Sequence, residues 1–263
     1  MNDSFLLDHR DGVLTVTFNR PERLNAFRRA EYHRLRDLLG EIERDAAVRV
    51  VVLTGSGRGF CAGEDLKELD AASHEAAGHD AALTRENALV LQDITRTVVR
   101  SERVYLAAVN GVAAGFGAEL ACACDVRLAG EGGRFLFPEV KRGLFITNGI
   151  SYTLPRLVGD NWAATLLLTG DGIDAPTAKR IGLVSEVVAG ESLLAVAQAM
   201  AAGIAANAPT AVRHTKRILR GDADALERAL ATEVAYLDAV LASGEYLEGA
   251  RAFVEKRLPR YGR

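Results

Sequence analysis

Short apolar runs and longer amphipathic stretches alternate along the first 191 residues of the chain. The apolar runs predict strands at residues 5–9, 13–18, 48–54, 104–109, 125–128 and 183–188. The amphipathic stretches predict helices at residues 30–46, 84–101, 150–157, 161–169 and 175–181. Asp11-Gly12, between the first two runs, is a hairpin signal. Because this alternation is typical of a mostly parallel sheet with crossover helices, the pattern predicts an α/β fold.

From residue 192 onward the pattern is helical only, with a helix starting at Pro209 and others predicted at residues 223–241 and 245–257. This change predicts a core at residues 1–191 and a C-terminal helical region at residues 192–263. The longest uncharged stretch, residues 192–212, is mostly alanine and contains Pro209. It therefore predicts a helix buried in protein and not a membrane span.

Composition excludes several classes of protein. The 263 residues are 49% hydrophobic and 25% charged, a soluble globular balance. The net charge of −3 provides no basic field for nucleic acid or anionic lipid. Three cysteines make no disulfide framework, and the N-terminus lacks the pattern of a signal peptide, so a reducing, cytoplasmic location is expected.

Several familiar motifs are incomplete. Gly55-Ser56-Gly57 follows a strand, but Phe60 takes the place of the third glycine of a dinucleotide fingerprint. No Walker lysine and no G-x-S-x-G elbow occur. His74 and His79 are five positions apart, which puts them on different helix faces and favours a solvated loop over a metal site.

The segment from residue 104 to residue 125 carries the strongest chemical signal. A buried strand runs into the glycine-spaced turn Gly115-Phe116-Gly117, and Glu119 follows as a lone carboxylate in uncharged surroundings. If a helix begins near Gly115, the unpaired amide of Phe116 and the Glu119 side chain share one face. The alternative is a buried turn with Glu119 at its rim.

A second turn, Gly63-Glu64-Asp65, has the same design, with a buried strand before it. Two such turns facing each other would offer two main-chain amides, as an oxyanion hole does. Glu119 and Glu139 lie in mostly apolar stretches, and burial would suit them to acid/base work near neutrality. The alternatives are a Glu119 paired with an arginine and a Glu139 that caps the turn after Pro138.

With these residues in view, the chain resembles the crotonase superfamily, the enoyl-CoA hydratase/isomerase family, over nearly its whole length. The resemblance rests on six blocks in order: TFNRPERLNAF (17–27), FCAGEDL (60–66), AAVNGVAAGFGAEL with CD following (107–125), PEVKRGL (138–144), LPRLVG (154–159) and EGARAFVEKR (248–257). It implies a spiral core of ββα turns and a C-terminal helical region used for trimerisation, in a homotrimer or a hexamer made of two trimers.

The resemblance also assigns roles to residues. The main-chain NH groups of Glu64 and Phe116 would form the oxyanion hole. Glu119 and Glu139 match the two glutamates of the hydratases, with Glu119 expected as base and Glu139 as proton donor. The positions expected to contact substrate or coenzyme A are Arg23, Ala26, Ala62, Asp65, Leu66, Phe253 and Lys256. Because coenzyme A is part of the substrate, no separate cofactor and no metal is expected.

The resemblance implies an enoyl-CoA hydratase that adds water to a trans-2-enoyl-CoA thioester. The alternatives are a Δ3,Δ2-enoyl-CoA isomerase, another acyl-CoA enzyme of this fold, or a non-catalytic relative that binds CoA or RNA. Three departures alter the expected acyl pocket: Leu136-Phe137 before Pro138, residues 145–151 in place of a proline- and glycine-rich stretch, and Glu64 where alanine is common.

Overall fold

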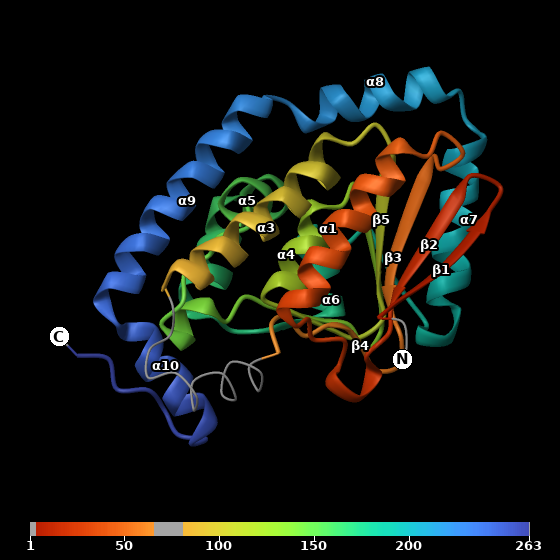
Figure 1. Cartoon of the computed structure of the whole chain (residues 1–263). Coiled ribbons are helices and arrows are strands. Elements are labelled where there is room, and N and C mark those ends of the chain that lie inside the picture. The colour runs from red at the N-terminus through yellow and green to blue at the C-terminus, as the bar shows by residue number, and fades with distance from the viewer. Residues whose placement is uncertain (1–3, 66–80, 263) are drawn as a thin grey trace.

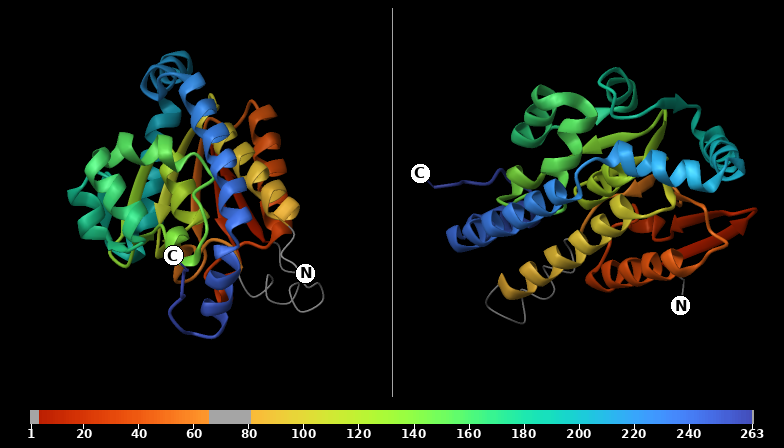
Figure 2. Two further views of the ribbon diagram at one scale, coloured as in Figure 1. Left: turned by 90° about the vertical axis from the view of Figure 1, so that its left-hand side faces the viewer. Right: turned by 90° about the horizontal axis from the view of Figure 1, so that it is seen from above.

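The computed structural model describes residues 4–65 and 81–262. In it, helices pack around two mixed β-sheets (Figures 1 and 2). The first sheet has the strand order β1-β2-β3-β5-β7-β10. Its strands are β1 (Phe5–Arg10), β2 (Val13–Phe18), β3 (Val50–Gly55), β5 (Val104–Val109), β7 (Val126–Gly130) and β10 (Glu186–Val188). Only the β1–β2 hairpin in this sheet is antiparallel. The predicted hairpin and the mostly parallel α/β sheet are thus confirmed.

The second sheet has the order β4-β6-β8-β9. The two glycine turns follow the carboxyl ends of β4 and β6 in this sheet. Its strands are β4 (Gly59–Cys61), β6 (Val112–Ala114), β8 (Arg134–Leu136) and β9 (Ile173–Asp174). β4, β6 and β8 are parallel, and β9 is antiparallel to β8. Because β4 and β6 are neighbours, the segments that follow them emerge side by side.

The helices alternate with the strands as far as β10 and then follow one another. The α-helices are α1 (Arg29–Arg44), α3 (Ala81–Arg100), α4 (Phe116–Ala123), α5 (Ile150–Thr169), α6 (Ala175–Arg180), α7 (Leu193–Ala206), α8 (Pro209–Arg220), α9 (Ala223–Ser243) and α10 (Glu245–Val254). Three short 3-10 helices are η1 (Pro21–Arg23), η2 (Glu139–Arg142) and η3 (Gly190–Ser192).

Several predicted boundaries differ from the structure. The two helices expected at residues 150–157 and 161–169 form one element, α5, which is broken by the non-helical backbone of Gly159 (φ 75°, ψ 161°). The strand expected from residue 183 pairs with β7 only from Glu186. α10 ends at Val254 and not at residue 257, because Lys256 has the left-handed φ of 54°.

Helices cover the first sheet on both faces. On one face α1, α3, α4 and α5 enclose the main core. On the other, α7 packs Leu193, Ala197, Ala201 and Ala205 against a group that includes Val50, Val52 and Leu106. The alanine-rich stretch is thus buried on one face only, and its other face is exposed. No single helix in the described part of the chain is long and apolar enough to span a membrane, although the pair 190–206 and 209–220, bent by 111°, meets that test of length and composition together.

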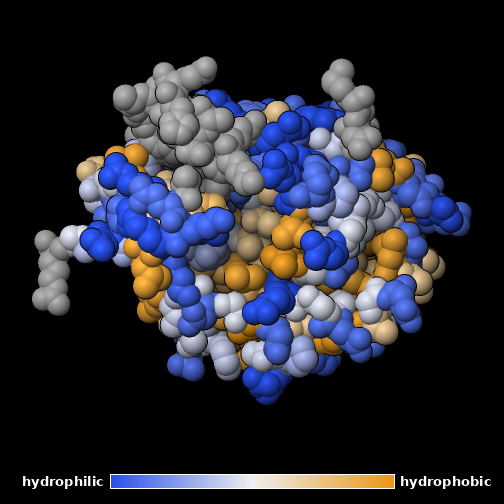
Figure 3. Space-filling model, turned by 90° about the horizontal axis from the view of Figure 1, so that it is seen from below, coloured by the Kyte–Doolittle hydropathy of each residue, from blue (hydrophilic) through white to orange (hydrophobic). Residues whose placement is uncertain are grey.

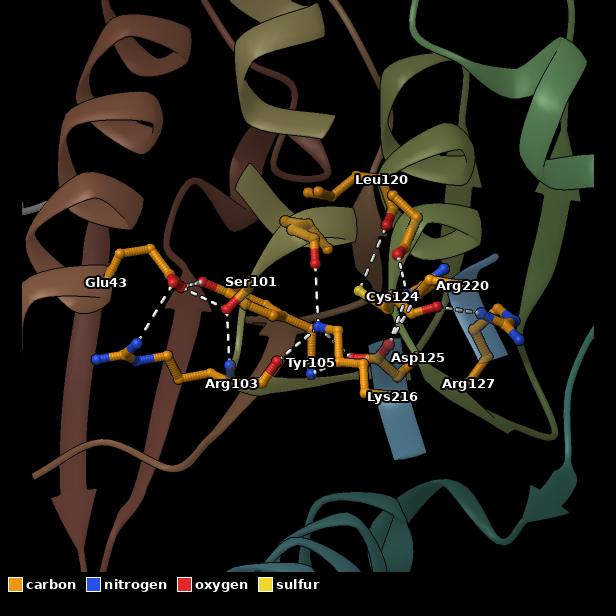
Figure 4. Close-up of polar contacts among 12 residues, drawn as sticks. Glu43, Ser101, Arg103, Tyr105, Leu120, Cys124, Asp125, Arg127, Lys216 and Arg220 are labelled. Carbon is orange, nitrogen blue, oxygen red and sulfur yellow. Dashed lines mark hydrogen bonds and ion pairs between the residues drawn. The ribbon is translucent and has the colours of Figure 1, made fainter. Parts of the chain in front are cut away.

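Asp125 ties α8 to the first sheet, as Figure 4 shows. Its carboxylate accepts from the Tyr105 main-chain NH (2.8 Å) and pairs with Lys216 (2.9 Å) and Arg220 (2.8 Å). Lys216 also donates to the carbonyl oxygens of Val98 and Arg103. This well-partnered acid joins β5, β7 and α8 directly behind α4.

Candidate active site

The turns after β4 and β6 lie against each other. Gly63 has a φ of 86°, and a Cβ on it would stand 2.7 Å from the Ala114 carbonyl oxygen and 3.7 Å from the Phe116 nitrogen. Phe27 NH donates to the Gly63 carbonyl (2.7 Å), and Asp65 NH donates to the Phe27 carbonyl (2.8 Å). Because successive peptide groups of an extended segment point to opposite sides, the Glu64 NH points away from Phe27.

The Phe116 NH opens helix α4. Gly115, with a φ of 52°, precedes it, and the first hydrogen bond of the helix runs from Glu119 NH to the Gly115 carbonyl (3.0 Å). The NH groups before Glu119 therefore have no partner inside the helix. The Phe116 ring packs edge-on against Tyr32 (4.9 Å between ring centres) and tilted against Phe27 (5.5 Å), which fixes the start of α4 against α1.

Two glutamates lie beside the start of α4. Glu119, in the first turn, is 4% exposed, and Glu139 opens η2 directly after Pro138. A Cβ on Gly115 would stand 3.1 Å from Glu139 Oε1, so this carboxyl group lies against the N-terminus of α4. Glu119 Oε1 and Glu139 Oε2 are both buried, with no hydrogen-bond partner among the described residues. The alternative expectation, a Glu119 paired with an arginine, is therefore wrong.

Burial controls the protonation of the pair. It raises the pKa of Glu119 well above its ordinary value, and the charges of Glu139 and Glu233 raise it further. Burial also raises the pKa of Glu139 to about 7, against the lowering effects of its own main-chain NH and the Arg142 guanidinium. Two buried carboxyl groups whose charges interact titrate as a pair, and a proton shared between them is favoured over two negative charges.

Sequence reasoning missed four residues. Asn148 and Glu233 both act on the pKa of Glu119, and Thr95 contacts Asn148. The fourth, Arg20, joins the two segments expected to contact coenzyme A. The Asn148 side chain is 1% exposed, faces Glu119 and lowers its pKa. The one available signal was that Asn148 lies in the divergent stretch 145–151.

The segments expected to hold coenzyme A are joined by Arg20. Its guanidinium donates to the Ala26 carbonyl oxygen (2.6 Å) and to Asp65 (3.0 Å), so it brings two of the predicted positions together. The amide of Ala62 donates to the Leu24 carbonyl. Arg23 ends η1 with an exposed side chain. Leu66 and the His74–His79 pair lie outside the described residues.

The C-terminal positions lie on the other side of η2. The Arg142 guanidinium stacks over the Phe253 ring at 4.6 Å, and a Cβ on Gly249 would stand 1.8 Å from the Arg142 carbonyl oxygen. α10 is thus in direct contact with the turn that carries Glu139. Lys256 follows α10 and is exposed. Seen from below, on the side where Figure 1 labels β4 and α10, the molecule is hollowed at its centre and apolar side chains line the hollow (Figure 3).

This arrangement suits the chemistry of a carbonyl compound. The amides of Glu64 and Phe116 come from adjoining turns, where they could stabilise negative charge on one oxygen. A buried carboxyl pair that shares a proton could supply a base and an acid to neighbouring carbon atoms.

Comparison with known proteins agrees with this geometry. Residues 8–263 match the family model for enoyl-CoA hydratase/isomerase. The chain is 34% identical to the 1,2-epoxyphenylacetyl-CoA isomerase of Escherichia coli K12 over 98% of both proteins. It is 36% identical to the short-chain-enoyl-CoA hydratase of Clostridium acetobutylicum over 97% of this chain and 96% of that one.

The fold matches as well. The crystal structure of an enoyl-CoA hydratase/isomerase from Pseudoalteromonas atlantica T6c superposes with a TM-score of 0.87, at 32% identity, covering 99% of this chain and all of the other. The fold is therefore the α/β crotonase fold, with two mixed sheets and C-terminal helices. The chain belongs to the enoyl-CoA hydratase/isomerase family of the crotonase superfamily.

Proposed function

We propose that this protein is an enoyl-CoA hydratase, which adds water across the double bond of a trans-2-enoyl-CoA. The observation that carries the proposal is the buried pair Glu119 and Glu139, each with an unpartnered oxygen, at the start of α4. Hydration needs both a base for water and an acid for Cα, and a pair with one proton between them provides both. The hydratase relative from Clostridium acetobutylicum supports the same reaction.

In the proposed mechanism the thioester oxygen accepts hydrogen bonds from the NH groups of Glu64 and Phe116. One carboxylate of the pair removes a proton from water as its oxygen bonds to Cβ, and the other carboxyl group protonates Cα of the enolate. We propose Glu119 as the base and Glu139 as the proton donor, the roles that the family resemblance implies.

The direct test is hydration of crotonyl-CoA, followed by loss of the conjugated absorbance. Glu119→Gln and Glu139→Gln keep the shape of each side chain and remove its proton chemistry, so each should reduce kcat/KM by about 10²- to 10⁴-fold. Substitution of the exposed Glu186 by Gln is the matched control and should change nothing. Unchanged hydration in both active-site variants would refute the assignment.

A Δ3,Δ2-enoyl-CoA isomerase is the second candidate, because the matching family model covers hydratases and isomerases alike. Isomerisation moves a proton between carbon atoms and needs no activated water. A reaction in ¹⁸O-labelled water separates the two, since only the hydratase product carries the label.

We further propose that Arg23, Ala26, Ala62, Asp65, Leu66, Phe253 and Lys256 contact the substrate, and that the protein works as a homotrimer or as a hexamer made of two trimers. Ile218 and Leu219 on α8 are 79% and 80% exposed, which supports a partner subunit over the C-terminal helices. Sedimentation equilibrium tests this, and a monomeric mass at micromolar concentration would contradict it.

A further inference from the structure

The loop that follows η2 is held by two helices, although it contains no regular structure of its own from residue 144 to residue 149. From α3, Gln92 donates to the carbonyl oxygens of Thr147 and Leu230 (both 2.9 Å) and thereby joins the loop to α9. From α9, Glu233 accepts from the Gly149 NH (2.7 Å) and from the NH and hydroxyl of Ser151. These contacts fix the backbone on both sides of Asn148.

The Asn148 side chain is fixed as well. The Thr95 hydroxyl lies 2.7 Å from Asn148 Oδ1 and 3.0 Å from its main-chain oxygen, and Thr95 itself is 0% exposed. With Oδ1 held by a donor, the amide Nδ2 faces the opposite way, toward the Glu119 carboxyl group. Nδ2 is buried and lies near enough to the Glu119 carboxyl group to lower its pKa, but like Glu119 Oε1 and Glu139 Oε2 it makes no hydrogen bond of normal geometry within the described ranges 4–65 and 81–262.

Such atoms are rare in this structure. Five buried side-chain polar atoms lack a partner within the described residues, and three of them belong to this one group of neighbours. A buried donor or acceptor without a partner destabilises a fold, so a cluster of three indicates a site that binds a polar group. That group must accept a hydrogen bond from an amide and donate hydrogen bonds to two carboxyl oxygens.

Water meets this requirement, because it has two hydrogens and two lone pairs. One hydrogen would go to each carboxyl group, and one lone pair would accept from Asn148 Nδ2. The second lone pair would remain for a bond to carbon. An arrangement of three fixed partners leaves the attacking lone pair with a single direction.

We propose that Asn148 is a further catalytic residue, whose Nδ2 group binds the water molecule that is added to the substrate, and that Thr95 is the residue that orients it. This inference rests on the proposed hydratase function and deepens it. In the step itself the water oxygen bonds to Cβ and loses one proton to the ionised carboxylate. The protonated carboxyl group gives its proton to Cα, and the π electron pair of the C=C bond becomes the new Cα–H bond.

The experiment compares hydration of crotonyl-CoA by the wild type, Asn148→Ala and Thr95→Val. A hydrogen bond to a charged or reacting group is worth about ten- to a hundredfold, so kcat/KM of Asn148→Ala should fall by about that factor. Thr95→Val should fall in the same direction, and Thr95→Ser, which restores the hydroxyl, should recover the activity. Asn161→Ala, an exposed asparagine on α5, is the control for the substitution itself.

The pH profile separates this role from a structural one. Asn148 lowers the pKa of Glu119, so its loss should alter the pH dependence of kcat/KM, with the pKa that reports Glu119 moving to higher pH. A purely structural role would reduce the folded fraction at every pH and leave the profile in place. If Asn148→Ala does not fold, the Thr95→Val and Thr95→Ser pair carries the same test.

Wild-type kinetics in ¹⁸O-labelled water decide the proposed function separately. Labelled product from the wild type with unchanged kcat/KM and pH profile in Asn148→Ala would overturn the inference and leave the hydratase intact. An unlabelled wild-type product would refute the hydratase, and the water site with it.

Discussion

Gly117, in the first turn of α4, sets the distance between the two turns proposed to form the oxyanion hole. A Cβ on this residue would stand 2.0 Å from the Cys61 carbonyl oxygen and 2.8 Å from the Cys61 Cβ. Ordinary van der Waals contact begins at 3.4 Å, so Gly117→Ala leaves the contact 1.4 Å too short. Both neighbours are backbone or close to it, and relief therefore requires α4 and the end of β4 to separate.

Such a shift reaches the proposed oxyanion hole directly, because Cys61 lies three residues before Glu64 and Gly117 directly follows Phe116. An amide moved by about 1 Å no longer donates well to an oxygen placed for the original geometry. Loss of one such donor should reduce kcat by about 10²- to 10³-fold. The overpacked contact should also lower the free energy of unfolding by about 1–3 kcal/mol.

The matched control is Gly203→Ala in α7, where a Cβ has nothing within 4 Å. Replacing a helical glycine with alanine there should stabilise the protein by about 0.5–1 kcal/mol and leave kcat unchanged. Both variants should be assayed for crotonyl-CoA hydration below their melting temperatures. A folded Gly117→Ala protein with wild-type kcat would show that the distance between these turns does not govern the reaction.

Three further predictions concern charge. Because burial raises the pKa of Glu139 to about 7, the folded protein binds that proton more tightly than the unfolded chain, so stability falls as pH rises from about 4.5 to about 7 and then levels off. Glu139→Gln should therefore melt above the wild type at pH 8, with the gap closing toward pH 5; a gap that is independent of pH would contradict this. Asp125→Ala leaves Lys216 buried without its carboxylate and should lower the free energy of unfolding, measured in urea, by about 3–5 kcal/mol. A decrease below about 1 kcal/mol would show that the hydrogen bonds from Lys216 to main-chain carbonyl groups are enough to stabilise its charge. Arg20→Ala removes the ion pair that holds Asp65 and should raise the KM for crotonyl-CoA. The KM for crotonyl-pantetheine, which lacks the nucleotide, should not change. An equal rise in both KM values would exclude a role of Arg20 in nucleotide binding.

The parts of the fold that the sequence predicts correctly are those determined by local patterns. The β1–β2 hairpin depends on Asp11-Gly12, with left-handed φ values of 49° and 82°, and the α1 stripe depends on the helical period. The start of α4 at Phe116 was predicted for the same reason, since Gly115 can adopt a φ of 52° without strain. Gly159 shows the limit, because it breaks α5 without ending it.

The residues that complete the candidate site could not be predicted, because their contacts join distant segments. Glu233 accepts from the Gly149 NH across 84 positions and from the Ser151 NH, in the first turn of α5, across 82. Thr95 reaches Asn148 across 53. No local pattern marks these residues, since a glutamate on an amphipathic helix normally faces solvent. Their roles follow only from the packing of α3, α9 and the loop into one place.

Asp125 and Glu119 show how one segment separates a structural carboxylate from a reactive one. They lie six positions apart and neither is freely exposed. Asp125 accepts a hydrogen bond from a main-chain amide and pairs with Lys216 and Arg220. These partners neutralise its charge, and through them it joins three elements. Among the described residues Glu119 has no cation beside it and its Oε1 has no partner, and its pKa is raised by burial and then by two other carboxyl groups. A carboxyl group in that state destabilises the fold, and its retention at the start of α4 is explained if the missing partners arrive with the substrate and water.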